Sequence, residues 1–178
     1  MARTPFVLAM LGLAAMPALS AVPEPAGLAR GLRAGADEEA AFVLSANGTH
    51  LFQCNSSLDP PNVYAWSFVA PDATLFEGSR PAGRHRAVGQ FESDSDRTSV
   101  FGVIRATQPG GSDNLPWAAM RAVPTGDSGM FAGVTTIQRV NTSGGVAPST
   151  GCTAATIGNE TRVNFSADYY FYKRRGTS

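Results

Sequence analysis

The chain has 178 residues, and its 14 basic and 14 acidic side chains give a formal net charge of zero. The two signs are scattered, and the one basic run is Lys173-Arg174-Arg175 near the C-terminal end. A nucleic-acid partner needs clustered basic residues, so none is expected. Beyond the N-terminal region no segment has the roughly 18 apolar residues of a membrane helix, so membrane insertion is not expected.

Residues 1–21 have the pattern of a secretory signal peptide. Arg3 gives a positive start, Phe6 to Ala15 form a short apolar run, and Ala18-Leu19-Ser20 supplies small residues at the usual cleavage spacing. The run is too short for a membrane span. We therefore expect a secreted, extracellular protein.

Residues 22–40 are rich in alanine, glycine and proline. Leu28, Leu32 and Ala36 share one side of a possible short helix, but the prolines and glycines favour a flexible leader or a removed pro-segment. Residues 41–174 are predicted to form one domain, followed by a tail at 175–178.

Short apolar or alternating runs from Ala41 onward predict β-strands. Asn47-Gly48 separates two such runs and predicts a hairpin. A strand over Val63–Val69 and a turn at Pro71-Asp72 are expected next. Tyr64, Trp66 and Phe68 share a face of that strand, which we interpret as core.

Two longer strands are predicted over Thr98–Thr107 and Phe131–Val140. Ser99 to Ile104 is almost continuously apolar, which predicts a strand covered on both faces. Before it, Glu92, Asp94 and Asp96 alternate in a polar segment. This segment is expected to be a solvated hairpin tip, with a Ca²⁺-binding loop as the alternative.

The last strand has the clearest alternation. One face carries Val163, Phe165, Ala167, Tyr169 and Phe171, and the other carries Arg162, Asn164, Ser166, Asp168, Tyr170 and Tyr172. The first set is expected in the core and the second toward solvent. Many short strands with regular turns predict an all-β fold, a single antiparallel β-sandwich or barrel domain.

The two cysteines, Cys54 and Cys152, are expected to form a disulfide in an oxidising compartment. Cys152 lies within a long stretch of small residues, Thr142 to Asn159. A loop of that length needs something to fix it, so the disulfide is predicted to staple it to the strand that ends at Cys54.

Five of the seven asparagines begin an Asn-x-Ser/Thr sequon, which predicts a glycoprotein. They are Asn47, Asn55, Asn141, Asn159 and Asn164. Asn164 falls on the outward face of the last strand, so its register agrees with glycosylation.

The candidate binding residues are Tyr170, Tyr172, Asp168 and His85. If Tyr170 and Tyr172 are exposed, their rings can stack on a sugar while Asp168 accepts hydrogen bonds from its hydroxyl groups. An extracellular polysaccharide is the partner that such a surface would suit. The alternative is that a second sheet or the Thr142–Asn159 loop covers these tyrosines.

His50 and His85 are the only histidines, and alternation places both toward the interior. A His–His–carboxylate site would need Glu77, Glu92 or Asp168 as its third member, and nothing in the spacing selects one. The sequence has no dinucleotide or phosphate-loop motif, so no cofactor is expected, and it predicts no metal site.

Several segments together resemble a family of small secreted proteins from fungi and bacteria. These segments are YAWSFVAPDATLF at 64–76, Gly83-x-His85, IQRVNTSGGVAP at 137–148, Gly151-Cys152 and SADYYFY at 166–172. The family is a domain of unknown function, number 3455, and the likeness covers about Ala41 to Tyr172. It typically has a tryptophan near Phe91. The resemblance implies fold and secretion but no activity.

Some fungal members of that family carry the name malate dehydrogenase, but this chain has no dinucleotide fingerprint and no βαβ alternation. We expect a non-enzymatic extracellular or cell-wall-associated protein that binds carbohydrate. The alternatives are a hydrolytic or metal-dependent enzyme that uses His85 and His50, and a small-ligand carrier, which the aromatic content suggests.

Overall fold

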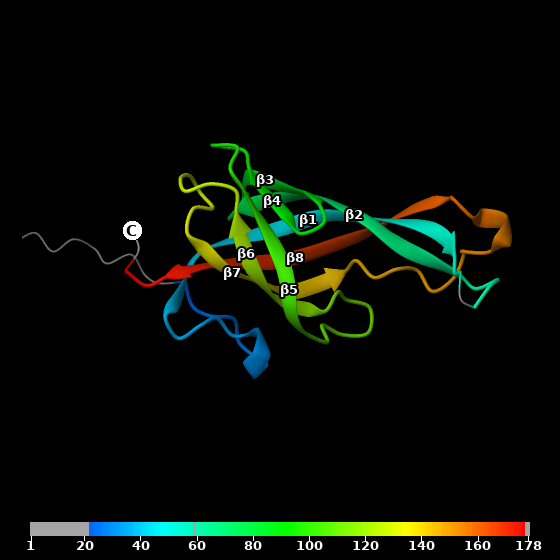
Figure 1. Ribbon diagram of the computed structural model, residues 1–178, viewed down its shortest axis with the longest axis horizontal. Helices are drawn as coiled ribbons and strands as arrows, with labels where there is room; N and C mark the ends of the chain where they lie inside the picture. The colour runs from blue at the N-terminus through cyan, green and yellow to red at the C-terminus, as the bar shows by residue number, and fades with distance from the viewer. Residues whose placement is uncertain (1–21, 59, 177–178) are drawn as a thin grey trace, which may run out of the picture.

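A computed structural model describes residues 22–58 and 60–176 (Figure 1). The predicted signal peptide and the last two residues of the predicted tail lie outside the described residues. The strands are β1 (Glu38–Ser56), β2 (Tyr64–Glu77), β3 (Arg80–Ala87), β4 (Gln90–Ser93), β5 (Ser99–Gln108), β6 (Trp117–Pro124), β7 (Val134–Gly144) and β8 (Glu160–Arg174). A 3₁₀ turn, η1 (Arg30–Leu32), precedes β1, and a second, η2 (Ala154–Thr156), lies between β7 and β8.

The eight strands form one closed antiparallel barrel in which each strand pairs with its neighbours in the chain, and β8 pairs with β1. The prediction of an all-β antiparallel fold is confirmed, and the structure selects the barrel over the sandwich. Closure removes the free edges that an open sheet would expose. Within these ranges no helix has the length and apolar character to cross a bilayer.

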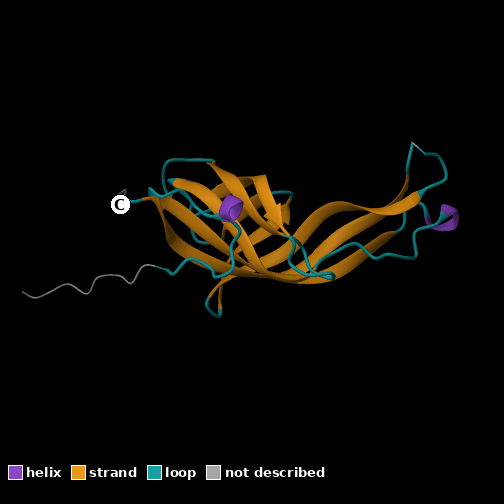
Figure 2. Ribbon diagram, turned by 90° about the horizontal axis from the view of Figure 1, so that it is seen from below, coloured by secondary structure: helices purple, strands orange, loops and turns teal. Residues whose placement is uncertain are grey.

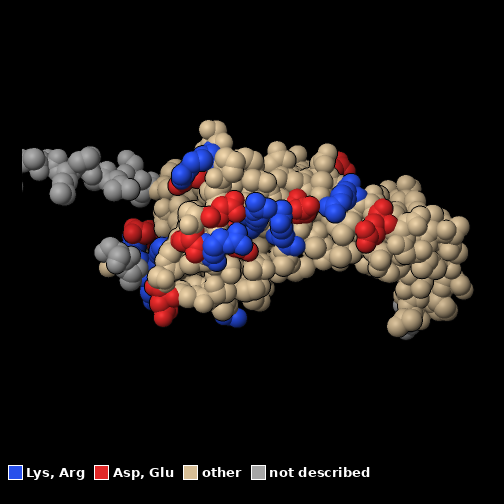
Figure 3. Space-filling view, turned by 90° about the horizontal axis from the view of Figure 1, so that it is seen from above, with Lys and Arg blue, Asp and Glu red and all other residues tan. Residues whose placement is uncertain are grey.

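Strands β1, β2 and β8 run on beyond the barrel as an extension, made of residues 51–56, 64–70 and 160–163 (Figures 1 and 2). There the strands pair only with each other, because β3 joins β2 at Ala73 and β7 joins β8 at Phe165. On the face seen from above, the far end of the extension is free of charged side chains (Figure 3).

Charged side chains of both signs mix over the barrel on that face (Figure 3). Arg84 pairs with Asp94 at 3.2 Å, and Arg97 pairs with Glu92 at 2.7 Å. These pairs engage Glu92 at the end of β4 and Asp94 in the β4–β5 turn. No surface of a single sign forms on this face.

One end of the barrel is filled by apolar side chains. Phe42 stacks on Phe171 with ring centroids 4.8 Å apart, and Phe131 packs against both rings. The inward residues of β8 continue this core, because Phe165, Ala167, Tyr169 and Phe171 are all buried. The alternation predicted for the last strand is therefore confirmed on its inner face.

Both turns predicted early in the chain are wrong. Asn47-Gly48 lies inside β1 and Pro71-Asp72 lies inside β2, and Gly48 pairs with Ala73 between the two strands. A Cβ atom on Gly48 would collide with the backbone of Asp72 and Ala73. The glycine is therefore needed for close strand approach rather than for a turn.

The prediction that Ser99–Ile104 is covered on both faces is also wrong. Phe101, Val103 and Ile104 are 39%, 51% and 55% exposed. In a closed barrel nothing covers the outer face of a strand unless another segment packs on it. Val103 therefore faces outward, and Ile104 faces an interior cavity that is open to solvent.

The N-terminal segment, residues 22–37, packs on the outer face of the barrel. Leu28 and Leu32 are buried in a cluster with Ala119 and Val140. Gln138 is fully buried, and its Nε2 donates to the Leu32 carbonyl at 2.7 Å. Strand β1 begins at Glu38, three residues before the domain start expected at residue 41.

The predicted disulfide between Cys54 and Cys152 is confirmed. It fixes the β7–β8 loop to the extension, where the Cys54 amide also donates to the Asn159 carbonyl at 2.9 Å. Trp66 holds the same loop through a hydrogen bond from its Nε1 to the Thr150 carbonyl at 2.8 Å.

Candidate functional site

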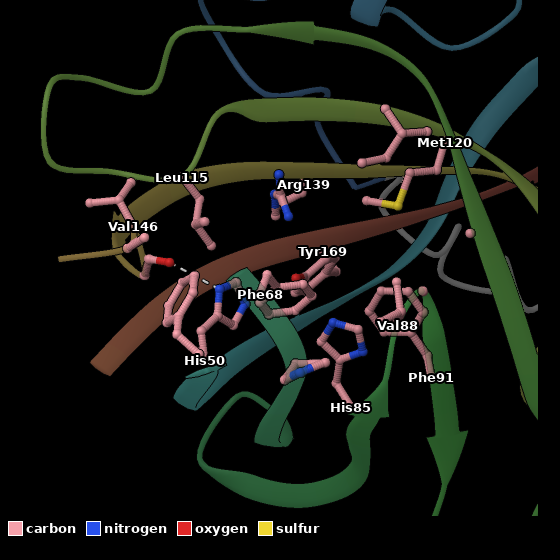
Figure 4. A pocket seen from close by; sticks show the side chains of 17 residues that line it. His50, Phe68, His85, Val88, Phe91, Leu115, Met120, Arg139, Val146 and Tyr169 are labelled. Atoms are coloured by element: carbon pink, nitrogen blue, oxygen red, sulfur yellow. Dashed lines mark hydrogen bonds between the residues drawn. The ribbon is translucent and has the colours of Figure 1, made fainter. Parts of the chain in front are cut away.

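A cavity of about 550 Å³ lies in the barrel where the extension leaves it (Figure 4). Its walls come from all eight strands and three loops. The lining residues are His50, Phe52, Phe68, Pro71, His85, Val88, Gly89, Phe91, Gly102, Ile104, Leu115, Met120, Arg139, Gly145, Val146, Ala147 and Tyr169. Most are apolar or aromatic. The exposed members Phe68, Val88 and Ile104 mark its opening.

Two glycines shape one wall of the cavity. The Gly102 amide of β5 donates to the Gly89 carbonyl in the β3–β4 turn at 2.8 Å. Gly89 has a φ of +72°, and a Cβ atom there would collide with the Gly102 carbonyl oxygen. A Cβ on Gly102 would press on the Met120 side chain. Because Gly89 and Gly102 have no side chains, the β3–β4 turn can pack closely on β5 and the cavity beside them stays open.

His50 lies on β1, opposite Pro71 of β2 and Val163 of β8. It is 5% exposed, and its ring packs on Phe165 with centroids 4.2 Å apart. Nδ1 lies 3.0 Å from the Gly145 carbonyl oxygen. Burial lowers the pKa of His50 to about 4; the Gly145 hydrogen bond opposes this shift and the Arg139 charge adds to it.

His85 lies on β3 and is 6% exposed. Its Nδ1 lies 2.6 Å from the Gln90 carbonyl oxygen, and its ring meets Tyr169 edge-on at 5.7 Å. Burial lowers its pKa to about 4, against the Gln90 hydrogen bond and with help from the charges of His50 and Arg139. Both rings are therefore neutral at pH 7.

The two backbone hydrogen bonds fix the tautomer of each ring. A carbonyl oxygen only accepts, so Nδ1 carries the proton in both histidines. In the neutral ring Nε2 is then an unprotonated acceptor. The cavity is thus lined by two neutral imidazoles, each of which can accept a hydrogen bond.

Arg139 and Tyr169 are cross-strand partners of β7 and β8, and both line the cavity (Figure 4). The Arg139 Nε and Nη2 donate to the Pro116 carbonyl at 3.1 and 2.8 Å. Among the described residues no carboxylate pairs with this guanidinium.

The Tyr169 hydroxyl is buried and makes no hydrogen bond within the described part of the chain. Burial raises the pKa of Tyr169, while the neighbouring Arg139 guanidinium, chiefly through its charge, acts to lower it. An unsatisfied buried hydroxyl costs stability, and such groups occur where a ligand or water supplies the missing partner.

The structure brings His50 and His85 to one cavity but leaves the candidate carboxylates outside it. Asp168 points away and accepts from Ser45 Oγ at 2.8 Å and Asn141 Nδ2 at 2.9 Å. Glu77 and Glu92 do not line the cavity either. The described residues contain no group of three or more His, Cys, Asp and Glu side chains able to hold a metal ion.

The predicted sugar-stacking face of β8 is not an open surface, and the expected exposure of Tyr172 is wrong. Tyr172 is 3% exposed, and its hydroxyl donates to Gln138 Oε1 at 2.6 Å. Tyr170 is half-buried against the cluster around Leu28 and Leu32. The N-terminal segment covers part of this face, where Leu28 and Leu32 pack against Tyr170.

The interpretation of Tyr64, Trp66 and Phe68 as core is also wrong. Tyr64 and Trp66 are half-buried on the extension, while Phe68 is 43% exposed beside the cavity opening. The role of Arg139 as a lining residue was missed. Its one sequence cue is that alternation along the strand places it on the same inward face as Ile137, where a charged residue is unusual.

The sequon asparagines are accessible. Asn47, Asn141, Asn159 and Asn164 are exposed, and Asn55 is half-buried. Asn47 and Asn164 lie on the paired strands β1 and β8, opposite Ser166 and Thr49 respectively.

Fold and site together define a small antiparallel barrel of eight strands, with one end filled and an interior cavity at the other. Residues 78–173 match the family described as protein of unknown function (DUF3455). That stretch is more than half of the chain, and the protein belongs to this family. No curated protein and no solved structure matches the chain.

Proposed function

We propose that the protein is an exported binding protein that holds a small, largely apolar molecule in the barrel cavity. The observation that carries this proposal is the cavity of about 550 Å³ with aromatic and aliphatic walls. Barrels of about eight strands have interiors that hold one small ligand, and ligand pockets typically measure about 300–1,000 Å³.

The positions of the polar groups support the same proposal. They are few, they face the cavity from different strands, and each is held by packing or by a backbone hydrogen bond. A pocket with apolar walls and a few fixed polar groups is typical of small-molecule recognition. A polysaccharide would need an open surface, and the proposed surface on β8 is covered.

Export is supported by three separate features. The predicted signal peptide and the five sequons come from the sequence, and the disulfide requires an oxidising compartment for its formation. Four sequon asparagines are exposed on the folded chain, where glycans would not disturb packing. We infer that the molecule works outside the cell as a glycoprotein.

The test uses N-phenyl-1-naphthylamine, a neutral dye that fluoresces when it enters an apolar site. We expect a saturable rise in fluorescence with the wild-type protein. Ile104→Trp places a large ring in the cavity, whereas Val103→Trp places the same ring on the outer face of the same strand. Both positions are about half exposed, so both variants should fold.

Ile104→Trp should weaken dye binding at least about tenfold, while Val103→Trp should bind like the wild type. No saturable binding by the wild type, or equal binding by the two variants, would contradict the proposed function.

A further inference from the structure

We propose that the cavity selects a flat organic acid, whose anionic group is bound by Arg139 and Tyr169 and whose ring lies among the aromatic walls. This inference rests on the proposed function and names the class of molecule that the cavity accepts.

The charge of the cavity favours an anion. Arg139 is the one charged side chain among the described lining residues, and no Asp or Glu accompanies it. Both histidines are neutral at pH 7, so the cavity carries one net positive charge. A partly buried cation without a counter-ion is costly, and an incoming carboxylate supplies the missing partner.

The free hydrogen-bond donors point to the same group. A guanidinium has five N–H donors, and the Pro116 carbonyl engages only Nε and Nη2 of Arg139. The Tyr169 hydroxyl has no partner within the described residues. A carboxylate with one oxygen toward each side chain would satisfy both, through charge-assisted bonds that are stronger than neutral ones.

The donors are held in place before any ligand arrives. The Pro116 carbonyl orients the guanidinium, and strand pairing places Arg139 directly opposite Tyr169. Tyr169 is fixed by ring contacts to Phe91 at 4.7 Å and His85 at 5.7 Å. Pre-organised donors bind an anion without the cost of ordering flexible side chains.

The shape of the remaining wall favours a flat ring. Phe52 and Phe68 meet edge-on at 5.8 Å beside the opening, and His85 lies flat on Phe91 deeper inside. Leu115 of the β5–β6 loop and Met120 of β6 also line the cavity (Figure 4). Aromatic rings pack on such walls in stacked or edge-on arrangements.

The experiment compares 2-naphthoate with 2-naphthamide, which has the same shape but no charge. Each compound competes with N-phenyl-1-naphthylamine at pH 7.5. The wild type should bind naphthoate at least about tenfold tighter than naphthamide. Arg139→Met and Tyr169→Phe should each reduce this preference, with little effect on naphthamide. Arg121→Met, an exposed arginine on β6, is the matched control.

The possible results separate this inference from the proposed function. Dye and naphthamide binding without any preference for naphthoate would overturn this inference and leave the proposed function standing. No dye binding at all would overturn both. If Arg139→Met does not fold, Tyr169→Phe alone decides: an unchanged naphthoate preference in that variant contradicts the role of Tyr169.

Discussion

The imidazole of His85 lies flat on the ring of Phe91, with ring centroids 4.4 Å apart and planes inclined by 5°. Phe91 is fully buried, so this contact places a titratable ring in the apolar interior. The Gln90 carbonyl fixes the ring in its neutral tautomer. His50, which also lines the cavity, is fixed in its neutral tautomer by the Gly145 carbonyl.

These two histidines predict how stability depends on pH. Their pKa is about 4 in the folded protein, below the ordinary value of 6.5. Between pH 6.5 and 4 these histidines are protonated in the unfolded chain but stay neutral in the folded protein. The free energy of unfolding therefore falls as the pH decreases through this range. The loss is up to about 3 kcal/mol for His85, at about 1.4 kcal/mol per pKa unit, and smaller for His50, which is less completely shielded from solvent.

Urea denaturation at pH 7 and at about pH 4.5 measures this loss. His85→Gln retains a donor for the Gln90 carbonyl but cannot titrate, so its stability should change less between the two conditions. Hydrogen bonds from Thr98 and Met130 lower the pKa of Asp96 to about 2, so Asp96 titrates below this window. An equal loss in wild type and variant would refute the assignment to His85.

Tyr172→Phe tests how the N-terminal segment is held. The change removes the donor to Gln138 Oε1 and leaves a buried amide oxygen unsatisfied. We expect a loss of about 1–2 kcal/mol in the free energy of unfolding, measured by urea denaturation. Tyr170→Phe is the control, because its hydroxyl has no hydrogen bond among the described residues, and it should change stability by less than about 0.5 kcal/mol.

Removal of the disulfide should destabilise the protein, because Cys54 and Cys152 are 98 residues apart in sequence. Closing a loop of that size is expected to contribute about 2–5 kcal/mol through the unfolded chain. Cys54→Ala/Cys152→Ala should lower the urea midpoint accordingly. Identical midpoints for wild type and double variant would show that the loop is fixed by its hydrogen bonds alone.

Glycans are predicted at Asn47 and Asn164, whose side chains are exposed on neighbouring strands. When the protein is secreted by a eukaryotic host, treatment with an amide-cleaving glycosidase should lower its apparent mass in gel electrophoresis. Asn47→Gln and Asn164→Gln should each remove one step of that shift. A mass unchanged by the enzyme would mean that the sequons are unoccupied.

Predictions from the sequence were most accurate where a single requirement, such as burial of one strand face, determines the structure. Alternation along β8 placed Phe165, Ala167 and Phe171 inside because only one side of that strand faces the barrel core. The pairing of Cys54 with Cys152 followed from the expectation of an oxidising compartment and from the presence of two cysteines in the chain. In both cases no other part of the chain competes with the structure that the local pattern indicates.

It failed where distant segments compete with local preference. Asn47-Gly48 favours a turn, but Gly48 is required where β2 approaches β1. Tyr172 alternates outward as predicted, yet the N-terminal segment covers it. The inward direction of His50 and His85 was predictable, but their common cavity and its Arg139–Tyr169 pair depend on closure of the barrel.

The central claim is that the barrel cavity is the binding site, and methyl NMR during titration with N-phenyl-1-naphthylamine tests it most directly. The account predicts saturable shift changes for the methyl groups of Met120 and Leu115, which line the cavity. The exposed methyl groups of Leu58 and Ile157, outside the cavity, serve as the reference. Changes confined to Leu58 and Ile157, or none at any methyl group, would contradict it.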